Sequence, residues 1–103
     1  MDTQDIQIIQ EVDELEEPQK YYTALQRLID DGQAWNLEGF YGRNMMRAIT
    51  EGYCLLGLNA HNDAYGNKVP SRLDVQEGTK GTKQFVIEKQ GEDWAKLMEN
   101  PNN

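Results

Sequence analysis

Apolar residues recur at helical spacing along the first half of the chain. The first stripe predicts a helix over about residues 3–15, with Asp2 or Thr3 as its N-cap. Its members lie three residues apart: Ile6, Ile9, Val12 and Leu15. The pattern breaks at the sequence EEP, so we expect the acidic N-terminal helical region to end at about residue 17.

Two further stripes have the i, i+4, i+7, i+8 spacing of an amphipathic helix. The second helix is predicted over about residues 18–31, opened by Pro18 and ended by Gly32. Its apolar positions are Tyr21, Leu25, Leu28 and Ile29. The third helix is predicted over about residues 40–51 and is ended by Gly52. Its apolar positions are Tyr41, Met45, Ala48 and Ile49.

The second half of the chain is less periodic. Residues 53–57, YCLLG, are a short apolar run, either a buried strand or a last piece of helix. Asparagine, glycine and proline then predict a long loop over residues 57–82. A brief strand at 67–70, in a short β-hairpin, is an alternative within it. Long loops in small domains are often functional, so a recognition site there is a second alternative to a structured turn region.

The C-terminal region also allows two interpretations. The first is a helix capped by Thr82 whose stripe continues through Gly91. Its positions are Val86, Gln90, Trp94, Leu97 and Met98. The second is a strand over 84–89, suggested by two β-branched residues, followed by a helix over 92–99. We favour the helix, and we expect residues 101–103 to be frayed.

These elements predict one mainly α domain over residues 1–103. It is a compact bundle of three to four helices with a long Gly/Asn-rich loop. The chain has 103 residues, of which 38% are hydrophobic, enough for a small core. No apolar run is long enough to cross a membrane, and the acidic N-terminus does not resemble a signal peptide. A single cysteine excludes a disulfide framework and favours a reducing, cytoplasmic compartment.

Negative charge is concentrated at the N-terminal end. The chain carries a net charge of −8, and residues 1–31 hold nine acidic residues against two basic ones. Such a field repels phosphate backbones, so nucleic acid is a disfavoured ligand, whereas a basic partner surface is attracted. The alternative is a solvated surface that aids solubility. The candidate partner-binding residues are Glu11, Asp13, Glu14, Glu16, Glu17 and Tyr22.

Tyr22 is included because it falls off the helical stripe, as does Tyr65, and exposed tyrosines are favoured at binding surfaces.

The residues whose side chains could act in catalysis or bind a metal do not form a catalytic or metal-binding set. His61 is the only histidine, and the residues around it do not fit a calcium-binding loop. Cys54 lies in an apolar run, which is typical of an inert buried thiol, and only Asp63 stands beside His61 as an orienting acid. We therefore predict a protein without catalytic residues, bound metal or cofactor.

Two other binding modes remain open. The segment 78-GTKGTK-83 is the most basic patch, and glycine-rich backbone can hold a small anion or nucleotide. The residues for this alternative are Arg72, Lys80, Gly81 and Lys83. On the third helix, Arg43 and Arg47 lie one turn apart and would contact DNA in a further alternative. Pairing of Arg47 with Glu51, or with acids of the first two helices, is the simpler interpretation.

Several segments resemble small tailed-bacteriophage proteins of uncharacterised function. They are the tyrosine pair at 21–22, WNLEG at 35–39, YGR at 41–43, YGNKVPSR at 65–72 and GTKG at 78–81. The resemblance implies a cytoplasmic accessory protein in an infected bacterium, of a kind that redirects or blocks host factors. It implies no activity.

Together these observations predict a non-enzymatic acidic protein that binds and modulates a host protein with a basic surface. The N-terminal acids would form the contact. A homodimer seam built from exposed isoleucine and leucine of the first helix is also possible on this pattern.

Overall fold

The computed structural model describes residues 3–32, 39–62, 66 and 68–101, without the side chains of Thr3 and of residues 39–43. The fold is mainly helical, with five helices and one small two-stranded sheet in the described part. The helices are α1 (Thr3–Glu11), α2 (Pro18–Asp30), α3 (Gly39–Thr50), α4 (Lys83–Gln90) and α5 (Glu92–Glu99). The strands are β1 (His61–Asn62) and β2 (Lys68–Val69). Among the described residues, every helix is too short or too polar to cross a bilayer.

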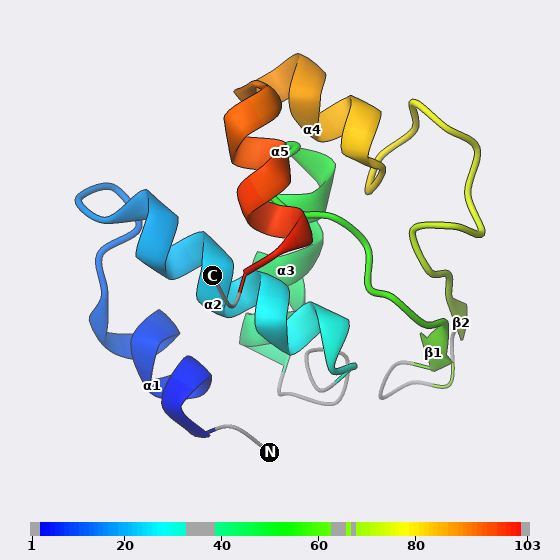
Figure 1. Cartoon of the computed structure of the whole chain (residues 1–103). Helices are drawn as coiled ribbons and strands as arrows, with labels where there is room; N and C mark the ends of the chain where they lie inside the picture. Colours follow the sequence, from blue (N-terminus) through cyan, green and yellow to red (C-terminus); the bar gives the residue numbers. More distant parts are fainter. Residues whose placement is uncertain (1–2, 33–38, 63–65, 67, 102–103) are drawn as a thin grey trace.

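Helix α2 lies at the centre of the molecule. Helix α1 packs on one side of it, α3 lies behind it and α5 lies above it in Figure 1, while the small sheet stands at the opposite edge from α1. Eight residues of α2 are buried: all of those from Tyr21 to Ile29 except Arg27. The apolar ones belong to one core cluster with buried residues of the other helices: Ile9, Met45, Ala48, Ile49, Val86, Ala95 and Met98.

Helix α1 is fastened to α2 by a buried ion pair. The Asp5 carboxylate, on a residue only 3% exposed, accepts from Nε of Arg27 at 2.8 Å. A second nitrogen of Arg27 donates to the backbone oxygen of Pro101 at 2.6 Å, so one guanidinium joins both ends of the chain to α2. Pro101 is buried, which corrects the expectation of fraying at that residue; residues 102–103 lie outside the described part.

The helix predicted over 3–15 ends at Glu11 instead. The carboxylate of Asp13 accepts the backbone N–H of Leu15 at 2.8 Å, and the backbone oxygen of Asp13 accepts from Glu16 and Glu17. Aspartate competes with helical hydrogen bonding in this way, so the chain turns before Pro18 begins α2. The boundaries predicted for the next two helices agree with the structure to within one residue.

An extended segment, residues 54–57, crosses the core beside α2. The buried amide of Gln26 accepts the N–H of Leu55 at 2.7 Å and donates to the Leu55 oxygen at 3.1 Å. Gln26 also donates to Asp30 at 3.0 Å, and Asp30 accepts from Arg72 at 2.6 Å. Nε of Arg72 donates a hydrogen bond back to the segment, to the backbone oxygen of Leu56, at 2.8 Å. The segment is thus neither a sheet strand nor a helix, and the Gln26 and Arg72 side chains supply part of the hydrogen bonds that a neighbouring strand would otherwise provide.

The long loop is ordered wherever it is described. Its two strands pair antiparallel, with His61 opposite Val69 and Asn62 opposite Lys68. The brief strand predicted at 67–70 is confirmed by β2. Further along, the backbone oxygen of Gly81 accepts from the N–H of Leu56 at 3.0 Å. Gly81 has φ +90°, and a Cβ built there would lie 2.4 Å from the Leu56 side chain, so only glycine fits.

The C-terminal region contains two helices and no strand. Thr82 caps α4 as predicted, with its hydroxyl accepting the N–H of Phe85 at 3.3 Å. The helix favoured for residues 84–89 is confirmed, but its continuation through Gly91 is wrong. Gly91 has φ +100°, outside the helical region, so α4 ends there and α5 begins in a new direction (Figure 1).

We expect the Gln26→Leu substitution to lower the free energy of unfolding by about 2–4 kcal/mol, measured by urea denaturation. Leucine has a similar volume, but it leaves the buried N–H and C=O of Leu55 without their partner. Gln19→Leu, at an exposed position of the same helix, is the matched control and should change stability by no more than about 0.5 kcal/mol. Equal effects of the two substitutions would contradict the role given to Gln26.

We also expect Cys54 to be nearly inert in the folded protein. Its residue is fully buried, and burial, reinforced by the charge of Asp30, raises the pKa of the thiol well above its usual range. Reaction with a disulfide reagent at pH 8 should be at least about 100-fold slower than in denaturant, because the thiol must wait for opening of the core. A native rate close to the unfolded rate would show that the extended segment is not held as described.

Candidate interaction surface

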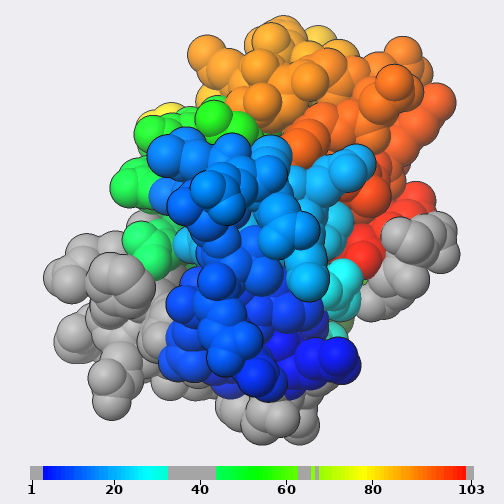
Figure 2. All heavy atoms as spheres, turned by 90° about the vertical axis from the view of Figure 1, so that its left-hand side faces the viewer, coloured from blue at the N-terminus to red at the C-terminus, as the bar shows by residue number. Residues whose placement is uncertain are grey.

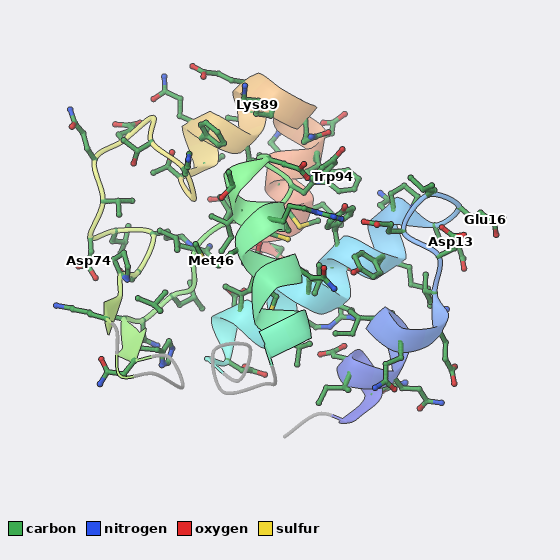
Figure 3. The ribbon with its side chains drawn as sticks, turned by 180° about the vertical axis from the view of Figure 1, so that it is seen from behind. Asp13, Glu16, Met46, Asp74, Lys89 and Trp94 are labelled. Carbon is green, nitrogen blue, oxygen red and sulfur yellow. The ribbon has the colours of Figure 1, made fainter. Side chains whose placement is uncertain are left out.

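One exposed charged feature is the acidic turn, residues 13–17, between α1 and α2. Its backbone is fixed by the three hydrogen bonds that Asp13 accepts from Leu15, Glu16 and Glu17. The side chains of Asp13 and Glu16 project away from the helices (Figure 3). Leu15 is 88% exposed at the centre of the turn. The turn therefore presents a large apolar side chain surrounded by carboxylates.

Glu14 is the one member of the turn that faces inward. Its carboxylate accepts from the Tyr22 hydroxyl at 2.8 Å and lies 3.4 Å from a nitrogen of Arg47 on α3. Burial and the bond to Glu14 raise the pKa of the Tyr22 hydroxyl, which stays protonated and donating at all physiological pH. Glu14 thus holds the turn against α2 and α3 and is not a free contact residue.

The proposal that Tyr22 is an exposed binding tyrosine is wrong. The residue is 7% exposed, and its ring stacks on Tyr53 with centroids 4.5 Å apart. Its off-stripe position is buried because α5 and the 53–57 segment cover a second face of α2, which the sequence of α2 alone does not reveal. Tyr65 lies outside the described residues.

Trp94 of α5 completes this aromatic cluster. Its ring meets Tyr22 and Tyr53 edge to face, at centroid distances of 5.9 and 6.2 Å. Its indole N–H donates to the backbone oxygen of Tyr53 at 2.9 Å. These ring contacts and this hydrogen bond together hold the Trp94 side chain in one orientation.

A shallow groove of about 630 Å³ runs between the start of α2 and α5. One wall consists of residues 16–20 and Thr23, and the other of Trp94 and Leu97. Figure 2 shows these two parts of the chain side by side on one face, with the start of α2 in blue and α5 in orange. The sequence gives no direct signal for this groove, because its walls are more than seventy residues apart.

The remaining predicted acids are open to solvent. Glu11, Asp13, Glu16 and Glu17 are all exposed, and Glu11 accepts from Gln7 at 3.3 Å. Glu11 ends α1 and the other three belong to the acidic turn. Leu15, treated in the sequence as part of a helical stripe, is a large exposed apolar residue beside these acids that the pattern did not predict.

The residues proposed for anion capture are mostly committed elsewhere. Arg72 has a side chain only 13% exposed and pairs with Asp30, so it is part of the core network rather than a ligand site. Lys83 pairs with Glu99 at 3.1 Å, and Gly81 packs on Leu56. Lys80 is exposed. The glycine-rich segment folds on itself, with the N–H of Gly78 donating to the Thr82 hydroxyl at 3.2 Å.

The basic side chain of α3 that the structure describes is also paired. Arg47 lies 3.4 Å from Glu14 and 3.7 Å from Glu51, which confirms the pairing expected from the sequence. The side chain of Arg43 lies outside the described part, so DNA contact through this helix stays a prediction.

No accessible nucleophile is formed by Cys54. Its thiol is buried and donates to the backbone oxygen of Tyr22 at 3.7 Å. The imidazole of His61 packs on Gly32, where an added Cβ would lie 2.3 Å from it. Asp63 lies outside the described residues, and the described residues contain no group of three or more side chains suited to a metal ion.

The apolar residues of α1 are largely used within the molecule. Ile9 is buried, and Ile6, Ile8 and Val12 pack against the core. The dimer seam predicted from this helix therefore loses its isoleucines, since they already have partners. Leu15 remains exposed, but it lies beyond the end of α1.

Comparisons of this chain with protein-family models, with curated proteins and with solved structures found no match.

Proposed function

We propose that this is a non-enzymatic interaction protein whose acidic turn and adjoining end of α1 bind a basic surface on a partner protein. The observation that carries the proposal is the exposed Leu15 at the centre of a fixed turn, ringed by Asp13, Glu16 and Glu17. An interface of this kind needs both an apolar anchor and polar groups around it, and the turn offers both.

The charge of this surface is available for a partner. Asp5 and Glu14 are engaged by Arg27 and Arg47, but Glu16 and Glu17 make no ion pair within the described residues. Unpaired carboxylates raise the rate at which a basic surface approaches and orients, with an effect that falls as salt rises. Leu15 would then supply the short-range apolar contact.

The conformation of the turn is already ordered before a partner binds. Asp13 fixes its backbone, and Glu14 joins it to Tyr22 and Arg47. A surface that is already ordered loses less conformational entropy on association than a mobile loop does. The phage-like sequence segments suggest that the partner is a bacterial host protein and that binding modulates or blocks it.

A pair of charge-reversed variants tests this function. Glu11→Lys with Glu16→Lys changes the proposed surface without touching Asp13 or Glu14, which hold the turn. We expect this variant to lose about tenfold or more of the partner recovered from bacterial lysate at low salt, measured by co-purification and quantitative mass spectrometry.

The matched control is Glu77→Lys with Glu88→Lys, which makes the same change in net charge at exposed positions far along the chain. We expect the control to retain the partners of the wild type. Loss of the same partners from both variants would reduce the effect to total charge, and retention by both would remove the acidic surface from the interaction.

A further inference from the structure

The groove between α2 and α5 adjoins the acidic turn but has a different composition. Glu16 and Glu17 stand at its rim, while Pro18, Trp94 and Leu97 provide apolar lining. Lys20 also lines it, so the local charge is two carboxylates against one ammonium. A hollow with an aromatic wall and an acidic rim differs from a merely solvated acidic surface, because it provides both shape and charge.

We propose that this groove receives an arginine side chain from an extended segment of the partner, with a neighbouring apolar residue of that segment against Leu97 and Pro18. The inference rests on the proposed function, which it deepens by naming the recognised chemistry. The argument for this occupant is charge complementarity combined with the indole wall.

Trp94 is suited to this role because its ring is held in one orientation at the groove wall. The bond from its indole N–H to the Tyr53 oxygen, at 2.9 Å, and its edge contacts with Tyr22 and Tyr53 hold it in place. Tryptophan is the best aromatic partner for a cation, and an arginine can stack its planar guanidinium on the ring. Figure 3 shows Trp94 on the side of α5 that faces the turn bearing Glu16.

Backbone hydrogen bonds hold the two residues that carry these carboxylates, Glu16 and Glu17. The N–H groups of Glu16 and Glu17 donate to the Asp13 oxygen at 3.2 and 2.9 Å, and Pro18 begins α2 directly afterwards. Neither side chain has an ion-pair partner among the described residues, so both are free to accept from a guanidinium. Arginine is favoured over lysine because it combines several donors, weak hydration and a flat face.

A peptide segment is favoured over nucleic acid by the same charges. A phosphate backbone would bring negative charge to Glu16 and Glu17 in a molecule with a net charge of −8. A second copy of the chain is the other possible occupant, and it would appear as association that depends on protein concentration.

Selection from a random peptide library on the immobilised full chain tests the inference. We expect enrichment of sequences that place arginine next to a large apolar residue. One enriched peptide is then titrated by calorimetry, with NMR detection of the Trp94 indole N–H, which should shift on binding.

Four variants locate the site. Glu16→Gln with Glu17→Gln should weaken binding of the selected peptide about three- to tenfold, and Lys20→Gln should strengthen it about twofold because a competing cation is removed. Glu11→Gln, which lies outside the groove, should leave the affinity unchanged. Gln19→Trp adds bulk to the groove wall at an exposed position and should block binding without disturbing the core.

The inference is overturned by a selection without arginine, by equal affinity of the groove and Glu11 variants, or by self-association in sedimentation runs. Each of these results leaves the lysate experiment intact, in which partner loss on reversing Glu11 and Glu16 still supports binding through the acidic turn. Conversely, groove-specific peptide binding combined with unchanged lysate partners would set aside the proposed function and keep the peptide site.

Discussion

The bidentate contact between the buried amide of Gln26 and the backbone of Leu55 organises this fold. It lets residues 54–57 pass through the core in an extended form without a neighbouring strand. Asp30 accepts from both Gln26 and Arg72, so the contact continues into the long loop. Burial raises the pKa of Asp30, while the Arg72 guanidinium opposes that shift by favouring the carboxylate. Because Leu56 then bonds Gly81, just before Thr82 caps α4, the same contact fixes where α4 and α5 begin and brings Trp94 beside α2.

A second constraint sorts the acidic residues into two roles. Asp5 is buried against Arg27, and Glu14 is shared by Tyr22 and Arg47, so these two acids hold α1 and the turn in place. The Asp5 charge is buried, so losing Arg27 would be costly, whereas the Glu14–Arg47 pair is largely exposed and positions the turn together with the Tyr22 hydrogen bond. The other acids of the region are exposed to solvent. The acids at this end of the sequence therefore divide into residues that hold the structure and exposed residues that we propose for recognition.

The sequence predicted the elements whose signals are local. The stripe of α2, the stops at Gly32 and Gly52, with φ +79° and +83°, and the Thr82 cap all depend on neighbours a few residues away. It did not predict the burial of Tyr22 or the pairing of Arg72, because their partners lie between eight and forty-two residues distant. The end of α1 was also misplaced, since an apolar residue at Leu15 continued the stripe while Asp13 had already turned the chain. The candidate groove could not be predicted from the pattern of any one element either, because residues 16–20 and Thr23 form it together with Trp94 and Leu97.

The position of the acidic turn has a thermodynamic reason as well as a functional consequence. Glu17 is the N-cap residue of α2 and Glu16 directly precedes it, so both residues lie next to the positive end of that helix, although the Glu17 side chain makes no capping hydrogen bond. A carboxylate at such an end is typically stabilised by about 0.3–1 kcal/mol, which offsets part of the repulsion among neighbours. Among the described residues, Glu16 and Glu17 are exposed and make no ion pair, and the end of α2 that follows them favours negative charge. Carboxylates held in this way are ready to accept a cation, and the fixed indole of Trp94 across the groove adds an apolar surface for the carbon chain that carries it.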